Sequence, residues 1–253
     1  MKLAEQHRST ERVLDILELV AQDGRPHYTL TQISQRLDAP KSSLLPILRT
    51  LHQRGYLFFE ESSATYSIGF KAYEIGTGYI RNGSIDDDII LLLRDITRGC
   101  AEASHFAQLN EGDVFYLFKE DSSESIRMFS SPGKRLPAYS TGLGKALLCE
   151  KAPEELHALY PNGLYAVTDM DRLLGQLAEV RQTGFAYEIE ESTDFIRCIA
   201  VPIRVDGCIR AALSVAVPVF RYTREKEIKI KELLENARGK LESLFEKFPW
   251  PYN

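Results

Sequence analysis

The stretch DAPKSSLLPILRTLHQRGYL, residues 38–57, begins with a small cationic group and continues as an apolar helix. Lys41, Ser42 and Ser43 follow a proline, and leucine and isoleucine then recur at helical spacing from Leu44. Hydroxyls, an ammonium and free backbone N–H groups at a helix N-terminus suit phosphate oxygens. The pattern predicts a helix whose first turn meets DNA. A serine that only caps the helix is the simpler alternative for Ser42.

Pro46 bears on where this helix begins. A proline deep inside a helix costs about 3 kcal/mol, whereas in the first turn the N–H that it lacks would be unpaired in any case. We therefore predict that the helix begins at Ser42 or Ser43. Arg49 lies farther along, on a face that can point outward to the DNA backbone or to a base.

The stretch STGLGKALL, residues 140–148, offers a second kind of chemistry. Small residues end a turn and open a helix there, and the N–H groups of such a turn suit an anionic ligand. It is not a nucleotide-binding P-loop, because Tyr139 replaces the first glycine and Ala146 replaces the final Ser or Thr. The alternative is that Gly142 and Gly144 only permit tight packing.

An enzyme is the alternative function class that the residue types allow. The four cysteines form no CxxC pair and no Cys/His metal spacing, so we predict buried thiols and no metal site; they are Cys100, Cys149, Cys198 and Cys208. A nucleophile would come from Cys149 or Cys198, and its base from His105 or His157. Nothing in their spacing supports such a pair, and we expect no catalytic residues.

Three glutamates, Glu188, Glu190 and Glu191, form an acidic cluster late in the chain. Such a cluster is compatible with metal binding or acid–base chemistry. Strand alternation would place Glu188 and Glu190 on one face and Glu191 on the other, which weakens the case for a shared site.

The elements that position the cationic turn lie at the start of the chain. Apolar residues recur at helical spacing over 9–22, and Thr29 or Thr31 can cap a second short helix before the third. Residues 57–69 then predict a hairpin with a small, uncharged tip. Three helices and a hairpin predict a winged helix-turn-helix domain over 1–68, with the hairpin as its wing.

The rest of the chain predicts a linker helix over 69–83 and a larger domain over 84–253. A helix begins at Ser84, and further helices are predicted at 141–150, 153–159, 171–183 and 224–247. Strands are predicted at 105–109, 114–119, 125–130, 185–189, 196–204 and 208–217. Strands and helices interleaved without regular βαβ units predict an α+β domain with a mostly antiparallel sheet.

Composition and charge narrow the function classes. The 253 residues carry a net charge of −5, but residues 1–83 hold ten Lys or Arg against nine Asp or Glu. The N-terminal part is therefore near neutral, and residues 84–253 are acidic. Local phosphate affinity is compatible with this distribution. No apolar run approaches the roughly 20 residues that span a bilayer, and MKLAEQHRST has no signal-peptide core. We expect a cytoplasmic protein without membrane partners.

The order and spacing of several motifs resemble the IclR family of bacterial transcription regulators. In the N-terminal part of the chain these motifs are RSTERVLDILELVA, LTQISQRL, APKSSLLPILRTLHQRGYL and YSIGFKAYEIG. In the C-terminal part they are GKRLPAYSTGLGKALL, RQTGFAYEIEES and RCIAVPIRVDGCIRAALSVAVP. The resemblance covers nearly the whole chain. It implies an N-terminal winged helix-turn-helix that binds double-stranded operator DNA and a C-terminal GAF-like domain that binds a small-molecule effector, without a cofactor, in a homodimer or homotetramer.

Site residues follow from the resemblance, position by position. The DNA-binding set would be Thr31, Lys41, Ser42, Ser43, Leu44 and Arg49, with Ser63 and Thr65 from the wing. The effector-binding set would be Ser140, Thr141, Gly142, Leu143, Glu188, Cys198, Ser214 and Ala216. The effector would be a small organic or sugar acid. A metabolite sensor without DNA activity remains the other alternative.

Three departures from the family pattern matter. Pro46 replaces an arginine or similar polar residue that helps to contact DNA, which shifts the expected contacts to Lys41 and Arg49. Phe195 lies in a segment, STDFIRC, where the family often has a glycine before the RC motif. Ala216 replaces a second serine and leaves the expected pocket slightly less polar.

Overall fold

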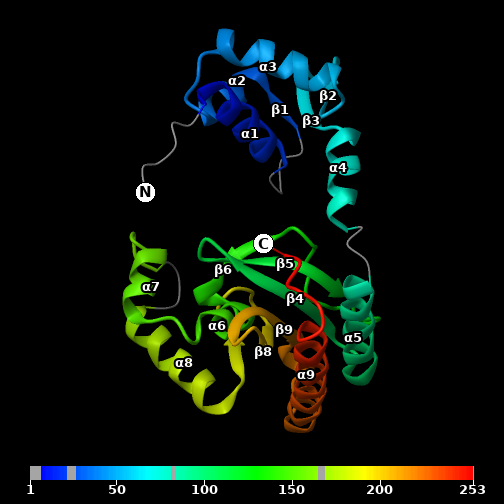
Figure 1. Ribbon diagram of the computed structural model, residues 1–253, viewed down its shortest axis with the longest axis vertical. Coiled ribbons are helices and arrows are strands. Elements are labelled where there is room, and N and C mark those ends of the chain that lie inside the picture. The colour runs from blue at the N-terminus through cyan, green and yellow to red at the C-terminus, as the bar shows by residue number, and fades with distance from the viewer. Residues whose placement is uncertain (1–6, 22–26, 81–83, 165–168, 253) are drawn as a thin grey trace. The chain divides into compact units, whose positions relative to one another are not determined.

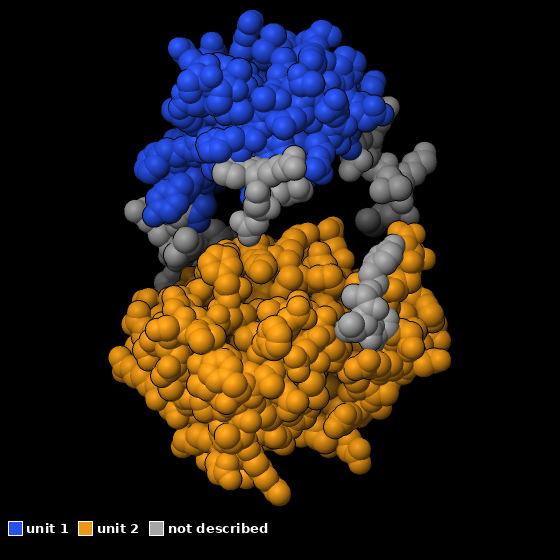
Figure 2. Space-filling view, turned by 180° about the vertical axis from the view of Figure 1, so that it is seen from behind, with its two compact units in different colours: residues 1–82 blue, residues 83–253 orange. Residues whose placement is uncertain are grey.

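The computed structural model describes residues 7–21, 27–80, 84–164 and 169–252. The chain divides into two compact units, residues 1–82 and 83–253, which are coloured separately in Figure 2. Residues 1–6 and 81–83, which the predicted domain and linker ranges include, lie outside the described residues. Each unit is described by itself.

The N-terminal unit consists of helices with a small antiparallel sheet (Figure 1). The helices are α1 (Arg8–Ala21), α2 (Leu30–Arg36), α3 (Lys41–Gln53) and α4 (Phe70–Ile80). The strands are β1 (Tyr28–Thr29), β2 (Leu57–Glu60) and β3 (Thr65–Ile68), in the order β1-β3-β2. Three helices with a β2–β3 hairpin give the winged helix-turn-helix fold that the sequence predicted.

Local sequence explains these elements. Thr29 caps α2 in a capping box with Gln32, each satisfying a backbone N–H of the other. Gly55, at φ +76°, follows the last turn of α3 in the left-handed conformation that glycine adopts most easily. The core between helices and hairpin is built from apolar side chains that include Ile16, Ile33 and Leu48.

Two predictions in this unit need correction. Helix α3 begins at Lys41, not at Ser42 or Ser43, so Pro46 lies in its second turn. Its missing N–H leaves the carbonyl of Ser42 without the usual i→i−4 bond. Both residues are exposed, so water can solvate that carbonyl. The short strand β1 was not predicted; its Tyr28 pairs with Tyr66 of β3.

The C-terminal unit is built on a six-stranded antiparallel sheet in the order β6-β5-β4-β9-β8-β7. The strands are β4 (Ala103–Asn110), β5 (Asp113–Glu120), β6 (Arg135–Pro137), β7 (Ala186–Ile189), β8 (Ile196–Val205) and β9 (Cys208–Pro218). The α-helices are α5 (Ser84–Cys100), α6 (Gly142–Leu148), α7 (Pro153–Leu159), α8 (Met170–Thr183) and α9 (Arg224–Phe245). Two 3₁₀ turns, η1 (Ala138–Ser140) and η2 (Val219–Arg221), follow β6 and β9.

Helices cover both faces of this sheet (Figure 1). On one face, α5 and α9 bury alternate residues of the central strands, among them Ile199, Val201 and Leu213. On the other face, α6 and α8 pack over the smaller Ala200 and Ala212. The alternation of large and small residues along β8 and β9 therefore separates an aliphatic core from a face with less bulk.

The strand predicted at 125–130 is absent: residues 121–134 contain no strand. The outer edge of β5 pairs instead with the unpredicted β6, where Val114 lies opposite Leu136. Met128 turns inward and packs against Cys198 and Ala216. The segment thus covers the end of the sheet without a strand partner.

Candidate functional site

The first candidate site is the outward face of α3. Lys41, Ser42 and Arg49 are all exposed on it. The ammonium of Lys41 donates a hydrogen bond of 2.8 Å to the hydroxyl of Thr31 in α2, so the structure brings these two predicted residues together. The first turn of α3 carries no side-chain cap, which leaves its leading N–H groups available.

Leu44 does not belong to this surface. Its side chain is completely buried in the core of the N-terminal unit, so its predicted contact with DNA is wrong for the side chain. Ser43 is half-buried, and its hydroxyl donates to the carbonyl of Pro40 at 2.8 Å. The Ser43 hydroxyl therefore does not cap the helix, and its oxygen can still accept a hydrogen bond.

The wing lies close to the distal part of α3. Arg49 is near enough to Tyr66 of β3 to act on the pKa of its phenol, which burial raises and the guanidinium lowers. At the wing tip, Ser63 and Thr65 bond to each other at 2.7 Å. The hydroxyl of Ser62 donates to Glu60. The wing, residues 57–68, therefore presents hydroxyls and the carboxylates of Glu60 and Glu61 and holds no cation, and Glu61 makes the tip charged, contrary to the prediction.

The second candidate site is a group of buried polar side chains on the face of the sheet that α6 covers. It consists of His105, Tyr116, Glu188, Cys198 and Ser214, and we call it the polar cluster. Strand register brings the group together. Ser214 of β9 lies opposite His105 of β4, and Glu188 of β7 lies opposite Cys198 of β8.

Glu188 is the acidic member of the polar cluster and is 1% exposed. Its Oε1 accepts hydrogen bonds from the backbone N–H and the hydroxyl of Ser192, at 3.1 and 3.0 Å. The thiol of Cys198 also bonds to this carboxylate, and burial holds the pKa of that thiol well above its ordinary value. Cys198 therefore keeps its proton and donates a hydrogen bond to the carboxyl group of Glu188.

His105 and Tyr116 belong to the polar cluster although the sequence did not assign them to the effector site. Nε2 of His105 lies 2.8 Å from the hydroxyl of Ser130, and its ring meets that of Tyr116 edge-on at 5.5 Å. Burial, and secondarily the charge of Lys119, lowers the pKa of His105 to about 4. The imidazole is therefore neutral at neutral pH.

The predicted residues before and within α6 border the polar cluster. Thr141 caps α6, its hydroxyl accepting from the N–H of Gly144 at 3.0 Å. A Cβ on Gly142 would lie 3.3 Å from Cβ of Cys198, so this glycine allows α6 to approach β8 closely. A Cβ on Gly144 would lie 2.0 Å from the carbonyl oxygen of Ala138, so Gly144 is required for packing.

The remaining predicted residues have separate places. Ser140 is buried, and its hydroxyl donates to the carbonyl of Pro137 at 3.1 Å. Leu143 is buried in the apolar core under α6. Ala216 lies opposite Cys198 and packs against Met128. Ala212, Ser214 and Ala216 are alternate residues of β9, and all three are buried small side chains on this face.

The loop after β7 departs from the expected alternation. Glu190 adopts φ +56°, which ends the strand. Glu190 is exposed, whereas Glu191 turns inward to Nζ of Lys145 at 2.6 Å. Phe195, in the segment where the family favours glycine, has φ +61° and is 73% exposed. The loop thus holds an aromatic residue in a left-handed conformation.

Among the described residues, neither Cys149 nor Cys198 forms a hydrogen bond with a histidine. Burial raises the pKa of Cys149 to about 11, and the other buried candidate, Cys198, bonds to a carboxylate and not to a base. His105 bonds to a serine. The prediction of buried thiols is correct for Cys100, Cys149 and Cys198, whereas Cys208 is exposed.

Two structural features are absent from the described part of the chain. Within it, no three His, Cys, Asp or Glu side chains are grouped in a way that would hold a metal ion. Within the same residues, none of the helices combines the length and the apolar character needed to cross a membrane.

Two family models together match most of the chain. Residues 9–60 match the family model of the IclR helix-turn-helix domain, and residues 77–242 match that of the bacterial transcriptional regulator IclR C-terminal domain. The HTH-type transcriptional regulator KdgR of Escherichia coli K12 is 29% identical over 251 residues, which span 96% of this chain and 95% of that protein. The HTH-type transcriptional regulator BhcR of Paracoccus denitrificans is 34% identical, over 85% of this chain and 79% of that protein.

A solved structure shows the same fold. It is an IclR homologue from Microbacterium hydrocarbonoxydans complexed with 4-hydroxybenzoate, with a TM-score of 0.80 and 22% identity. The likeness covers 94% of this chain and 99% of the other.

Proposed function

Since the chain belongs to the IclR family of bacterial transcriptional regulators, we propose that its outward α3 face reads an operator and that its polar cluster binds the effector. The burial of five polar side chains on one sheet face is the observation that carries the second assignment. A buried polar group costs free energy unless it is hydrogen-bonded, so such a face is retained where a ligand uses it.

The DNA contact would be made by cations and hydroxyls in the leading turn of α3. Lys41 and the Thr31 hydroxyl that it contacts lie at one end of this face. Arg49 lies eight residues along the helix, roughly 12 Å away at 1.5 Å per residue. Phosphate contacts of this kind position a helix in the major groove, and base contacts then specify the sequence.

The effector would be a small organic or sugar acid that also carries a hydroxyl or keto group. Tyr116 and Ser214 supply hydroxyl donors for its carboxylate. Glu188 supplies an acceptor for its hydroxyl. The bound 4-hydroxybenzoate of the Microbacterium hydrocarbonoxydans homologue, an acid with a hydroxyl group, has the same combination. An effector that carried a carboxylate but no hydrogen-bond donor would be disfavoured beside Glu188, because the carboxyl oxygens of Glu188 accept hydrogen bonds.

The oligomer would form through α4. Phe70, Tyr73 and Ile75 of this helix are 71%, 64% and 55% exposed, and Phe70 contacts Tyr73 ring to ring. An exposed apolar set on one short helix favours association. A second copy of this chain is the proposed partner, and the paired units would then face half-sites about one helical turn of DNA apart or a multiple of it.

A DNA-binding experiment tests the first part. A fragment selected from random DNA by the full-length protein would be titrated at several salt concentrations with Lys41→Ala and Arg49→Ala. Each variant should weaken binding and reduce the slope of log K against log salt by about one. Arg98→Ala, which removes an exposed cation from α5, is the matched control and should change neither. Unchanged affinity and slope for both α3 variants would refute the assignment.

A ligand experiment tests the second part. Organic and sugar acids would be screened by thermal shift, and the acid found would be titrated into the protein–DNA complex. Glu188→Ala and Ser214→Ala should abolish the response to the acid while binding to DNA without ligand persists. In the unmodified protein the acid should change operator affinity by a coupling free energy of about 1–3 kcal/mol. An undiminished response in both variants would place the effector elsewhere.

A further inference from the structure

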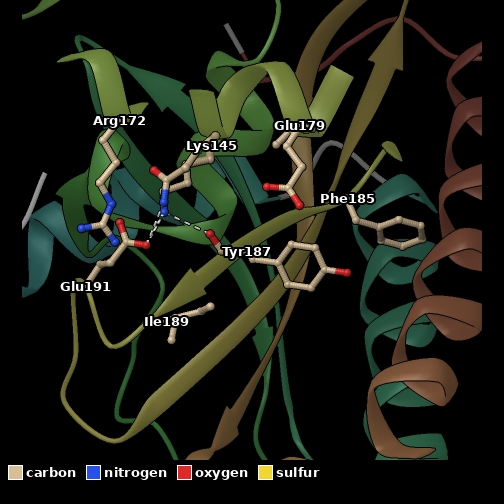
Figure 3. Close-up of a pocket in the computed structure, with 9 residues that line it drawn as sticks. Lys145, Arg172, Glu179, Phe185, Tyr187, Ile189 and Glu191 are labelled. Carbon is tan, nitrogen blue, oxygen red and sulfur yellow. Dashed lines mark hydrogen bonds and ion pairs between the residues drawn. The ribbon is translucent and has the colours of Figure 1, made fainter. Parts of the chain in front are cut away.

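A pocket lies between α8 and the edge strand β7, with Lys145 of α6 in its lining (Figure 3). Its volume is about 270 Å³. Phe185, Tyr187 and Ile189, alternate residues at the edge of the sheet, form its apolar wall. Its polar end is formed by Lys145 of α6, Gln176 of α8 and Glu191 of the loop after β7.

Glu191 is the centre of the polar end. Its side chain is 3% exposed, and its Oε1 accepts from Nζ of Lys145 at 2.6 Å and from Nε2 of Gln176 at 3.2 Å. Nζ of Lys145 also donates to the carbonyl of Tyr187 at 3.0 Å, as Figure 3 shows. Oε2 of Glu191 accepts no hydrogen bond from any described residue.

Gln176 carries a second vacant acceptor. The orientation of its amide is fixed, because only the NH₂ group can donate to the carboxylate of Glu191. Oε1 of Gln176 is therefore the atom left over, and it too is enclosed without a partner among the described residues. A buried polar atom without a hydrogen bond costs roughly 1–3 kcal/mol, so two at one pocket call for a ligand that donates.

Charge decides which donor fits. The lining holds two cations, Lys145 and Arg172, and two carboxylates, Glu179 and Glu191. A cationic ligand at Oε2 of Glu191 would lie beside the ammonium that already holds Oε1. An anionic ligand would face the vacant oxygen directly. An uncharged group with N–H donors meets neither repulsion.

We propose that this pocket binds a small, uncharged molecule bearing an amide or urea group, whose N–H donors reach Oε2 of Glu191 and Oε1 of Gln176 and whose apolar body packs against Phe185 and Ile189. The site is separate from the polar cluster. The turn from Glu188 to Ser192 borders both, so the test must distinguish the two sites.

Three probes of one shape test the proposal on the full-length protein: benzamide, its cationic isostere benzamidine and its anionic isostere benzoate. Affinities would be measured by calorimetry. A fragment of this size binds with a Kd of roughly 1 mM. We expect benzamide to bind about tenfold more tightly than either charged isostere, because each of these meets a like charge or lacks the donors.

Two variants locate the binding. Gln176→Leu, which removes one vacant acceptor, should weaken benzamide about tenfold, whereas Glu188→Gln in the polar cluster should leave its affinity unchanged. Methyl resonances of Ile189 and Val180, which line the pocket, should shift on titration of the unmodified protein. Absence of benzamide binding, equal affinity for benzoate, no effect of Gln176→Leu, or loss in Glu188→Gln alone would each overturn the proposal. These outcomes do not depend on DNA binding.

Discussion

At the scale of single residues, the protein places ionisable groups where burial controls their charge. His105 is 1% exposed and bonded to Ser130, with Tyr116 at its edge and Lys119 nearby. Its neutral form is therefore part of the folded structure. Because an unfolded histidine has a pKa near 6.5, protonation favours the unfolded chain in acid.

This gives a prediction for stability against pH. Between pH 6.5 and about 4 the unfolded state binds a proton at His105 that the folded state does not, so the free energy of unfolding should fall as the pH falls. The contribution is about 3 kcal/mol across that interval. Denaturant titrations at several pH values on the wild type and His105→Gln would measure it. The variant should lack this part of the slope, and equal slopes would contradict the prediction.

Residue-level predictions from the sequence were reliable where a local pattern carries the chemistry. Lys41 and Arg49 lie on the exposed face of α3 because helical spacing separates them from the apolar positions. His105 and Tyr116 were missed because only long-range pairing places them. Opposite Phe106 and Ala107 of β4, Leu117 is an extra residue in β5, and this bulge interrupts the alternation that would have shown which way Tyr116 points.

At the scale of elements, Pro46 is the feature that departs most from ideal helix geometry. It lies in the second turn of α3 and is exposed. The carbonyl of Ser42 therefore relies on water, and Thr50 adds a bond from its hydroxyl to the carbonyl of Pro46 at 2.9 Å. The helix remains because its opposite face is buried in the core of the N-terminal unit.

We therefore expect Pro46→Ala to raise the stability of the N-terminal unit by about 1–3 kcal/mol, since an interior proline costs roughly 3 kcal/mol relative to alanine and some of that is offset in the unfolded chain. Pro40→Ala is the matched control: Pro40 precedes the first turn, where no helical N–H is needed, and its replacement should not stabilise. Chemical denaturation would measure both. Equal effects of the two substitutions would show that Pro46 imposes no particular strain.

Most helices and strands were predicted, whereas the two shortest strands, β1 and β6, were not. Helices such as α9 and strands such as β8 follow apolar periodicity that is visible in the sequence. The strands β1 and β6 have two and three residues and exist only because a longer neighbour offers an unpaired edge. The apolar stretch 125–130 carries strand-like residues but finds no such edge. Edge availability is a tertiary property that one sequence does not display.

At the scale of the whole molecule, each unit has its own core. The apolar cluster of the N-terminal unit runs from Ile16 to Tyr66, and the large cluster under α5 and α9 runs from Ile85 to Tyr252. Trp250 and Tyr252 close the latter, the Tyr252 hydroxyl bonding to Asp86. The strand order of the sheet could not be derived from periodicity, and only the family resemblance implied a GAF-like arrangement.

Because each unit has a buried apolar cluster of its own, residues 84–253 produced alone should fold and bind the effector with an affinity within about twofold of the full-length protein, without binding the operator. Circular dichroism and thermal shift with the acid found by screening would test this. An unfolded or aggregated fragment would mean that the C-terminal unit needs the N-terminal residues for stability.

The close packing of helix α6 restricts how this helix can move. All seven of its residues are buried, and Gly144 fits against Ala138 with no room for a methyl group. An interior packed at crystal-like density transmits displacement instead of absorbing it. A movement of α6 toward or away from β8 must therefore displace α8, η1 or the sheet itself. Reporter dyes for such movement belong on the solvent-facing side of α8, because α6 has no surface on which to carry one.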